Sequence, residues 1–325
     1  MIMKKQIFYL IALSILFASC STQEIGSDDD INNNQGISSS ELFKYVNYNL
    51  DVSANPPIPL DSTVYTILNN RYHEITRYLP SGDTRASMFI YSNNKIDRVE
   101  YYNNGVLAVD ETQIFTYGSN GLVSERLTYN SSLNTYTKRT YSKVADTTYV
   151  YVFNSNDGIN FTPATISSKV VTDAQDKVTY VERVDSTGNE PSTYINYIYD
   201  GMGNLVSESK DRDYDNNGTL INDVTYNMTY TTIDNPIAAI RDNTYSRYFN
   251  NINYYTRSGS VNLTIGPTFI SPKQIETYEY TLFSSFPTRV TNQVNTDGNI
   301  ETITYLTVDS GGVPFTSFTQ KFSYQ

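Results

Sequence analysis

Short strands separated by glycine-containing turns dominate the sequence, and residues 194–207 show this unit most clearly. Ile195, Tyr197 and Tyr199 occupy alternate positions there, which places them on one face of a strand with a two-residue period. The following run from Asp200 to Asn204 contains two glycines and an asparagine, residues that tolerate the positive φ angles of tight turns. The stretch therefore predicts a β-hairpin.

Glycines mark the turns of this unit at regular distances along the chain. Gly105 and Gly121 lie 16 residues apart, and Gly188, Gly203 and Gly218 follow one another at intervals of 15. A strand of about ten residues and a turn of four or five fill each interval, so successive turns fall on opposite edges of a sheet. No window of helical length shows a convincing 3.6-residue period. The sequence therefore predicts an all-β fold with little helix, an extended and twisted antiparallel meander of hairpin repeats.

The amino-acid composition favours one class of fold and excludes some classes of binding partner. Thirty tyrosines, no tryptophan and 39% hydrophobic residues favour strands whose amphipathic rings lie half-buried. The formal net charge of −11 repels nucleic acid, which we therefore exclude as a partner. The single cysteine, Cys20, rules out a disulfide within one chain and a cysteine-based metal cluster.

The first twenty residues have the pattern of an export signal. Two lysines precede an almost wholly apolar stretch, Ile7–Phe17, which is long enough for a signal sequence and too short to span a bilayer. The run Phe17–Cys20 resembles the lipobox of bacterial lipoproteins. That resemblance implies that residues 1–19 are a signal peptide and that Cys20 is lipidated and anchors the chain to a membrane. An ordinary secretory signal that ends near a cysteine is the alternative.

The segment after the cysteine is polar and has little to bury. We expect residues 20–44 to form the lipidated cysteine and a disordered tether, which includes the acidic run Asp28–Asp30. That run resembles the surface-export signal of Bacteroidota lipoproteins, which implies a lipid-anchored protein exposed at the outer-membrane surface; a plain solvated linker is the alternative. Residues 45–325 are predicted to form a single β-rich repeat domain, with an irregular excursion at about 236–275 that has room for a short helix.

Two of the turns resemble a known repeat. The run Tyr199–Leu205, Tyr-Asp-Gly-Met-Gly-Asn-Leu, resembles the YD repeat of the RHS family, and Tyr214–Leu220 matches it except at Thr219. The segments Ile233–Ile237 and Phe283–Val290 resemble parts of Bacteroidota surface lipoproteins of unknown function that contain such repeats. The resemblance implies extended antiparallel β architecture and brings no catalytic residues.

One of these turns is also a candidate calcium site. Asp213, Asp215 and Asn217 place oxygens at positions 1, 3 and 5 of a calcium loop, with a glycine at position 6. Position 12, where a bidentate carboxylate belongs, is Val224. A YD-type turn explains the same residues without a metal, so calcium is the only cofactor that the sequence offers and both interpretations stay open.

Candidate catalytic groups are few. His73 is the only histidine, so a Ser-His-Asp triad would need it, and a surface imidazole on a strand is the simpler interpretation. The 34 acidic residues allow a pair of carboxylates for glycoside hydrolysis, but the sequence singles out no pair. We therefore predict a non-catalytic envelope lipoprotein that binds a glycan or a protein, or has a structural role. The alternative is a carbohydrate-active hydrolase with paired carboxylates.

Overall fold

The structure is a computed structural model, and it describes most of the chain after the predicted tether. The described residues are 42–51, 58–109, 112–130, 134–185, 191–215, 217–255, 270–280, 288–308 and 314–324. Among these residues, no helix is long and apolar enough to cross a membrane.

The described part of the chain contains nineteen strands and two helices. In chain order they are β1 (Leu42–Asp51), β2 (Ile58–Leu68), β3 (Arg71–Tyr78), β4 (Thr84–Ser92), β5 (Lys95–Asn103), β6 (Val106–Leu107), β7 (Gln113–Tyr117), β8 (Val123–Asn130), β9 (Thr135–Val144), β10 (Thr147–Ser155), β11 (Thr162–Thr172), β12 (Val178–Asp185), β13 (Ser192–Tyr199), β14 (Leu205–Asp213), β15 (Ile221–Asp234), α2 (Pro236–Tyr245), α3 (Arg247–Tyr255), β16 (Lys273–Tyr280), β17 (Thr288–Val294), β18 (Ile300–Val308) and β19 (Pro314–Tyr324).

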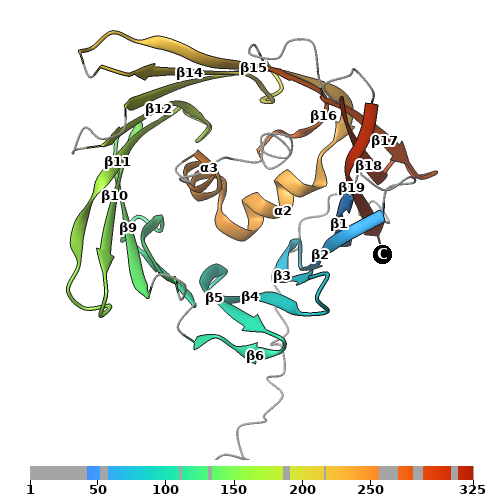
Figure 1. The fold of residues 1–325 in the computed structure, drawn as a ribbon, viewed down its shortest axis with the longest axis horizontal. Coiled ribbons are helices and arrows are strands. Elements are labelled where there is room, and N and C mark those ends of the chain that lie inside the picture. Colours follow the sequence, from blue (N-terminus) through green and yellow to red (C-terminus); the bar gives the residue numbers. More distant parts are fainter. Residues whose placement is uncertain are drawn as a thin grey trace, which may run out of the picture. The chain divides into compact units, whose positions relative to one another are not determined.

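The strands form one large antiparallel sheet that is nearly closed into a barrel (Figure 1). Neighbours along the chain pair with each other, and only the short β6 is bypassed, because β5 also pairs with β7. The first strand, β1, pairs with β2 on one side and with β19 on the other. The predicted all-β antiparallel meander with little helix is confirmed, and its curling into a barrel, with β1 paired to β19, is an additional finding.

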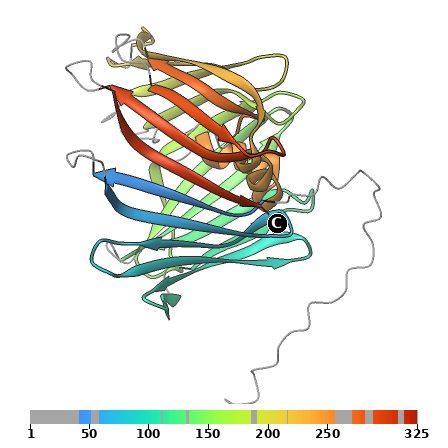
Figure 2. The same ribbon diagram turned by 90° about the vertical axis from the view of Figure 1, so that its right-hand side faces the viewer.

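The strands run between two ends of the barrel where the turns gather (Figure 2). Because each strand reverses direction, the turn at Asp200–Asn204 lies at the same end as those at Gly118–Leu122, Asp173–Lys177 and Asn295–Asn299. We call this end the first rim. The turns at Leu79–Asp83 and Asp213–Gly218 lie at the other end, the second rim.

The apolar core lies inside the ring of strands, where α2 and α3 are also found (Figure 1). Ile237, Phe249 and Ile252 of the two helices are fully buried. Phe249 meets Phe115 and Tyr141 of the wall edge-on, with ring centroids 5.9 and 5.2 Å apart. A ring of this many strands is too wide for its own inward side chains to fill, so the helices complete the core.

The sequence explains why a helix begins at Pro236. The side chain of Asn235 accepts a hydrogen bond from the amide of Ile237, and the proline at the first helical position has no amide hydrogen that needs a partner. The chain reverses at Ser246, which has a φ of 64°, before α3. In its described part, the excursion expected at about 236–275 consists mainly of these two helices.

The turns of the first rim share one hydrogen-bonding pattern. In the turn at Asp200–Asn204, the amide of Asp200 donates to the carbonyl of Asn204, and the amide of Gly203 donates to the carbonyl of Asp200, both at 3.0 Å. Gly203 has a φ of 88°, which is why a glycine is favoured there. One carboxylate oxygen of Asp200 accepts the amides of Met202 and Asn204. The turns at 118–122, 173–177 and 295–299 repeat the two main-chain bonds.

Tyrosine hydroxyls link the first-rim ends of several strands to an earlier first-rim hairpin. The hydroxyl of Tyr199, the residue before the Asp200 turn, donates to the carbonyl oxygen of Val178 at 2.9 Å. Val178 begins the strand after the preceding first-rim turn. Four more bonds follow the same arrangement: Tyr91 to Tyr72 (2.7 Å), Tyr117 to Ile96 (2.7 Å), Tyr230 to Leu205 (2.6 Å) and Tyr324 to Ile300 (2.8 Å). All five acceptor residues are at most 1% exposed, so water cannot replace the tyrosine as donor.

A basic residue accompanies three of these tyrosines. It directly precedes the acceptor residue, and its charge lies over the ring of the donating tyrosine. The three pairs are Arg71 over Tyr91 (5.5 Å to the ring centroid), Lys95 over Tyr117 (5.0 Å) and Lys177 over Tyr199 (5.3 Å). Cation–π contacts of this kind cover the tyrosine rings at the rim and add a modest stabilisation to each link.

Candidate functional site

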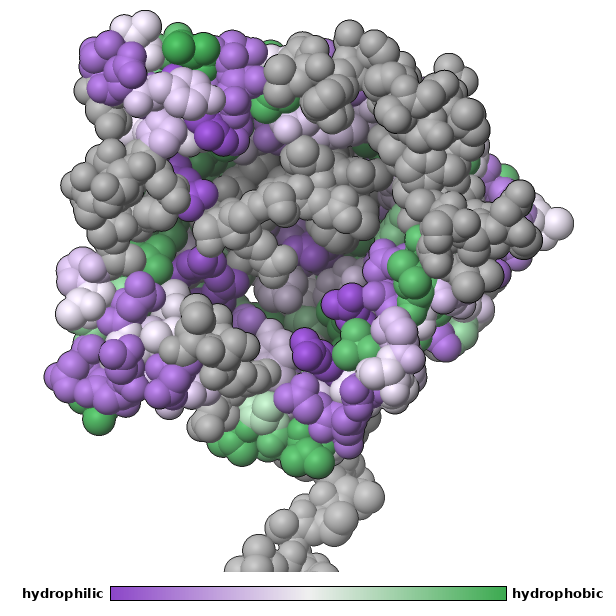
Figure 3. Space-filling model, viewed as in Figure 1, coloured by the Kyte–Doolittle hydropathy of each residue, from purple (hydrophilic) through white to green (hydrophobic). Residues whose placement is uncertain are grey.

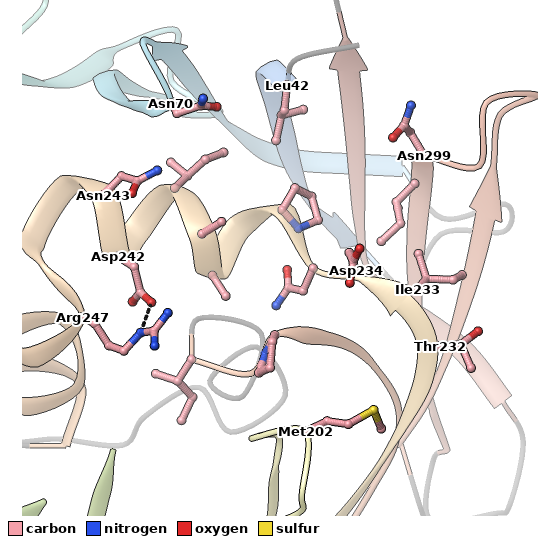
Figure 4. Close-up of a pocket in the computed structure, with 18 of the residues that line it drawn as sticks. Leu42, Asn70, Met202, Thr232, Ile233, Asp234, Asp242, Asn243, Arg247 and Asn299 are labelled. Atoms are coloured by element: carbon pink, nitrogen blue, oxygen red, sulfur yellow. Dashed lines mark hydrogen bonds and ion pairs between the residues drawn. The ribbon is translucent and has the colours of Figure 1, made fainter. Parts of the chain in front are cut away.

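A cavity of about 920 Å³ opens at the first rim, between α2 and the surrounding strands (Figure 4). Asn70, Met202 and Asn299 border it from three first-rim turns, and Asp242 and Asn243 border it from α2. We call it the rim cavity. The volume lies within the range of small-molecule sites. The ring of strands is also hollowed at the opposite end, the second rim, where Figure 3 shows hydrophilic side chains around the opening.

The end of α2 provides a fixed charged group on the cavity wall. One oxygen of Asp242 pairs with Arg247 Nε at 2.9 Å (Figure 4), and the other accepts the side-chain amide of Asn250 at 3.0 Å. Arg247 and Asn250 both belong to α3, so the same contacts hold the two helices together. Asp242 is thereby placed as a hydrogen-bond acceptor of defined orientation.

The other carboxylate of the cavity is far more exposed. Asp234 ends β15 and pairs with Lys273 Nζ at 2.5 Å, but its side chain is 89% exposed. Solvent screens such a pair, and its contribution to stability is small. The side chain of the next residue, Asn235, makes two hydrogen bonds. Its amide group donates to the carbonyl of Ser271, and its oxygen caps α2.

The remaining lining combines amide and apolar groups with one further cation, Lys177. Amide side chains such as Asn70 and Asn243 offer both donors and acceptors, while Met202 and Ile270 offer apolar surface. Such a lining offers a ligand both hydrogen bonds and apolar contact. Sequence reasoning missed these residues, because only the Asn235-Pro236 pair signals that a helix enters here.

The residues singled out in the sequence lie away from this cavity. Cys20 is outside the described residues. The turn of Asp213, Asp215 and Asn217 is at the second rim, and His73 is an exposed residue of β3. The structure therefore brings none of them into the rim cavity.

The proposed calcium ligands form a turn with its own hydrogen bonds. The two carboxylate oxygens of Asp213 accept the main-chain amides of Asn217 (3.1 Å) and Gly218 (2.8 Å), and the side-chain oxygen of Asn217 accepts the amide of Thr219. Asp213 is buried, whereas Asp215 is exposed. Within the described ranges, no group of three or more His, Cys, Asp or Glu residues could hold a metal ion. The calcium site, with its two carboxylates and one amide, stays a prediction.

One inward-facing carboxyl has an unusual environment. Glu208 of β14 lies directly opposite Tyr197 on one neighbouring strand and Tyr226 on the other, and both tyrosines are buried. Burial raises the pKa of Glu208 to about 7, while the charge of Lys210 acts in the opposite direction. Glu208 does not line the rim cavity.

Comparisons with known proteins found little. No protein-family model matches the sequence, and no curated protein matches it. Among solved structures, the chain is similar to a porin-like protein from Bacteroides uniformis, with 9% sequence identity over 87% of this chain and 96% of that one, and a TM-score of 0.43. It is also similar to a porin-like protein from Bacteroides vulgatus, with 12% identity, coverages of 88% and 99%, and a TM-score of 0.28. These TM-scores are too low for either likeness to support an argument.

Glu208 makes stability depend on pH in a specific direction. Its pKa in the folded protein, about 7, lies above the ordinary value of 4.5, so folding favours the protonated form. The stability that it contributes is complete below pH 4.5 and is lost as the pH rises through 7. We expect Glu208→Gln, which stays neutral, to remove this loss, as measured by denaturant unfolding across that interval. Glu100→Gln is the control, because hydrogen bonds from Arg98 lower the pKa of Glu100. Parallel pH curves for Glu208→Gln and the parent would contradict the prediction.

Proposed function

We propose that this protein is a non-catalytic module of a bacterial cell envelope. In this proposal a lipid on Cys20 anchors it to the outer membrane, the barrel is exposed at the cell surface, and the rim cavity binds a glycan or a segment of a protein. The observation that carries the proposal is the rim cavity itself, a polar recess with a rigid floor formed by α2 and α3.

The state of Asp242 favours binding over catalysis. Its two oxygens are engaged by Arg247 and Asn250, a geometry that presents a fixed acceptor to a ligand hydroxyl. A general acid or base must instead exchange a proton with its substrate in a site arranged around that transfer. The contacts of Asp242 therefore fit recognition.

The outer face of the barrel supports an anchored domain outside the bilayer. Lys169 and Glu182 pair at 3.8 Å on this face, since Val170 and Val181 beside them point inward and are buried. Charged side chains directed at lipid are costly in the middle of a bilayer. A lipid-modified N-terminus would hold such a domain at the membrane without placing this surface in it.

The alternative is the carbohydrate-active hydrolase. One observation favours it, because Asp234 and Asp242 line the same cavity. Glycoside hydrolysis uses two carboxyl groups, one on each side of the scissile bond. The two functions differ in whether a bound glycan is cut.

Binding without cleavage is the expected outcome for the rim cavity. We would incubate the purified chain with a panel of neutral oligosaccharides, and measure both retention and the appearance of new reducing ends. The proposal predicts retention of at least one oligosaccharide, weakened by Asp242→Asn, with no new reducing ends. New reducing ends that vanish in both Asp234→Asn and Asp242→Asn would replace it with the hydrolase. Retention of none would reject the neutral glycans as ligands.

Replacement of the anchor residue should change location and leave the fold intact. Because the thiol is the only group in the chain that can accept the lipid in a lipobox, Cys20→Ala should prevent acylation. We expect the variant in the soluble fraction, or unprocessed with its signal still attached, and with the same circular dichroism as the parent. Ser27→Ala, in the same polar segment, should stay acylated and in the membrane fraction. An acylated Cys20→Ala protein would disprove the anchor.

A further inference from the structure

A second cavity, of about 710 Å³, lies near the second rim. It is lined by the inner faces of β2 to β5 and by the turns that end these strands at Asp83 and Asn104. We call it the arginine cavity, because Arg77 and Arg85 both line it. The rim cavity opens at the other rim, so the two are separate sites.

The two arginines are direct neighbours across two strands. Arg77 of β3 lies opposite Arg85 of β4 in the antiparallel register. Both side chains are on the inner face, because Arg77 is two residues from Ile75, which packs on the core, and Arg85 is four residues from the buried Phe89. Like charges directly opposite each other destabilise a strand pair. Both arginines are exposed, so solvent screens part of this repulsion, and an anionic partner would offset the rest.

The described side chains offset it only in part. Arg77 pairs with Asp61 at 2.6 Å. Arg85 has no ion pair with any residue that the structure describes. The nearby carboxylate of Asp83 accepts hydrogen bonds from the Ser81 hydroxyl (2.7 Å) and the Asn104 amide (2.8 Å), which lower its pKa, and the charge of Arg85 adds a smaller lowering.

We propose that the arginine cavity binds an acidic sugar, with its anionic group between Arg77 and Arg85. Guanidinium groups bind carboxylate and sulfate oxygens with two parallel hydrogen bonds, so two facing arginines form a site for one such group. The hydroxyls of Thr63 and Ser87 line the same cavity and can bond the hydroxyls of a sugar ring, whereas the hydroxyl of Tyr101, which also lines it, already accepts a hydrogen bond from Gln113. The site is independent of the rim cavity and of the anchor, and it would stand if both of those failed.

Calorimetric titration of the purified chain tests this site with defined probes. Galacturonic acid carries a carboxylate, glucose 6-sulfate carries a sulfate, and glucose carries neither. We expect at least one of the two acidic sugars to bind, glucose not to bind, and added salt to weaken binding. The acidic sugar that binds more tightly shows whether the site prefers a carboxylate or a sulfate. If inorganic sulfate bound and neither acidic sugar did, the assignment of a sugar as the ligand would be overturned. If glucose bound as tightly as the acidic sugars, the role of the anionic group would be overturned.

Variants of the second arginine give the matched comparison. Arg85→Gln should weaken acidic-sugar binding by about tenfold or more, because a charged hydrogen-bonding partner is lost. Arg85→Lys keeps the positive charge but lacks the planar guanidinium group. Its affinity for the acidic sugar should therefore lie between those of the parent and of Arg85→Gln. Arg98→Gln, on the outer face of β5, should bind like the parent. Unchanged affinity in Arg85→Gln would disprove the proposal.

The melting temperature of the ligand-free variants separates binding from folding. Removal of one of two facing positive charges should leave the melting temperature of Arg85→Gln equal to that of the parent or higher. If Arg85 had only a structural role, Arg85→Gln would melt at a lower temperature than the parent. A lower melting temperature of Arg85→Gln, together with parental affinity of Arg85→Lys for the acidic sugar, would contradict the proposed binding site.

Discussion

A hydrogen bond from a tyrosine hydroxyl to the main chain of an earlier hairpin is the interaction on which this fold depends. A hairpin alone is at best marginally stable in water, and a meander of hairpins gains stability only as each packs on its neighbours. The carbonyls of Val178, Leu205 and Ile300 are buried under the first rim, where an unpaired acceptor would cost free energy. The tyrosines satisfy these carbonyls and fix the position of each hairpin against an earlier one.

Closure of the sheet creates the need for the two helices and, with them, the two cavities. Since β1 pairs with β19, the inward side chains surround a space that they cannot fill. The segment after β15 supplies α2 and α3, which pack on the wall through Phe249 and occupy the middle of this space. Recesses remain towards both ends, one lined by the end of α2 and one by facing arginines. Recognition at either rim thus follows from how the interior is filled.

Local patterns in the sequence predicted the strands and turns, but not their long-range arrangement. Tyrosines at alternate positions indicate strands, and glycines with a positive φ angle, such as Gly203, indicate turns. Both signals are local, and the structure confirms them. Pairing of β1 with β19 joins opposite ends of the chain, which no local pattern specifies. Tyr199 and Tyr214 begin nearly identical motifs, yet Tyr199 bonds a buried carbonyl while Tyr214 is exposed and bonds Asp223. The candidate sites were missed for the same reason, because the Arg77–Arg85 contact depends on strand register.

Removal of a single tyrosine hydroxyl tests the central claim most directly. Tyr199→Phe keeps the ring and removes the hydrogen bond from the hydroxyl to the buried carbonyl of Val178. The free energy of unfolding, measured in denaturant, should fall by about 1–3 kcal/mol. Tyr151→Phe is the control, because that residue is 47% exposed, and the substitution should leave the free energy of unfolding unchanged. If the two variants were equally stable, the hydroxyl would not hold the hairpins together, and the dependence of the fold on these bonds would be disproved.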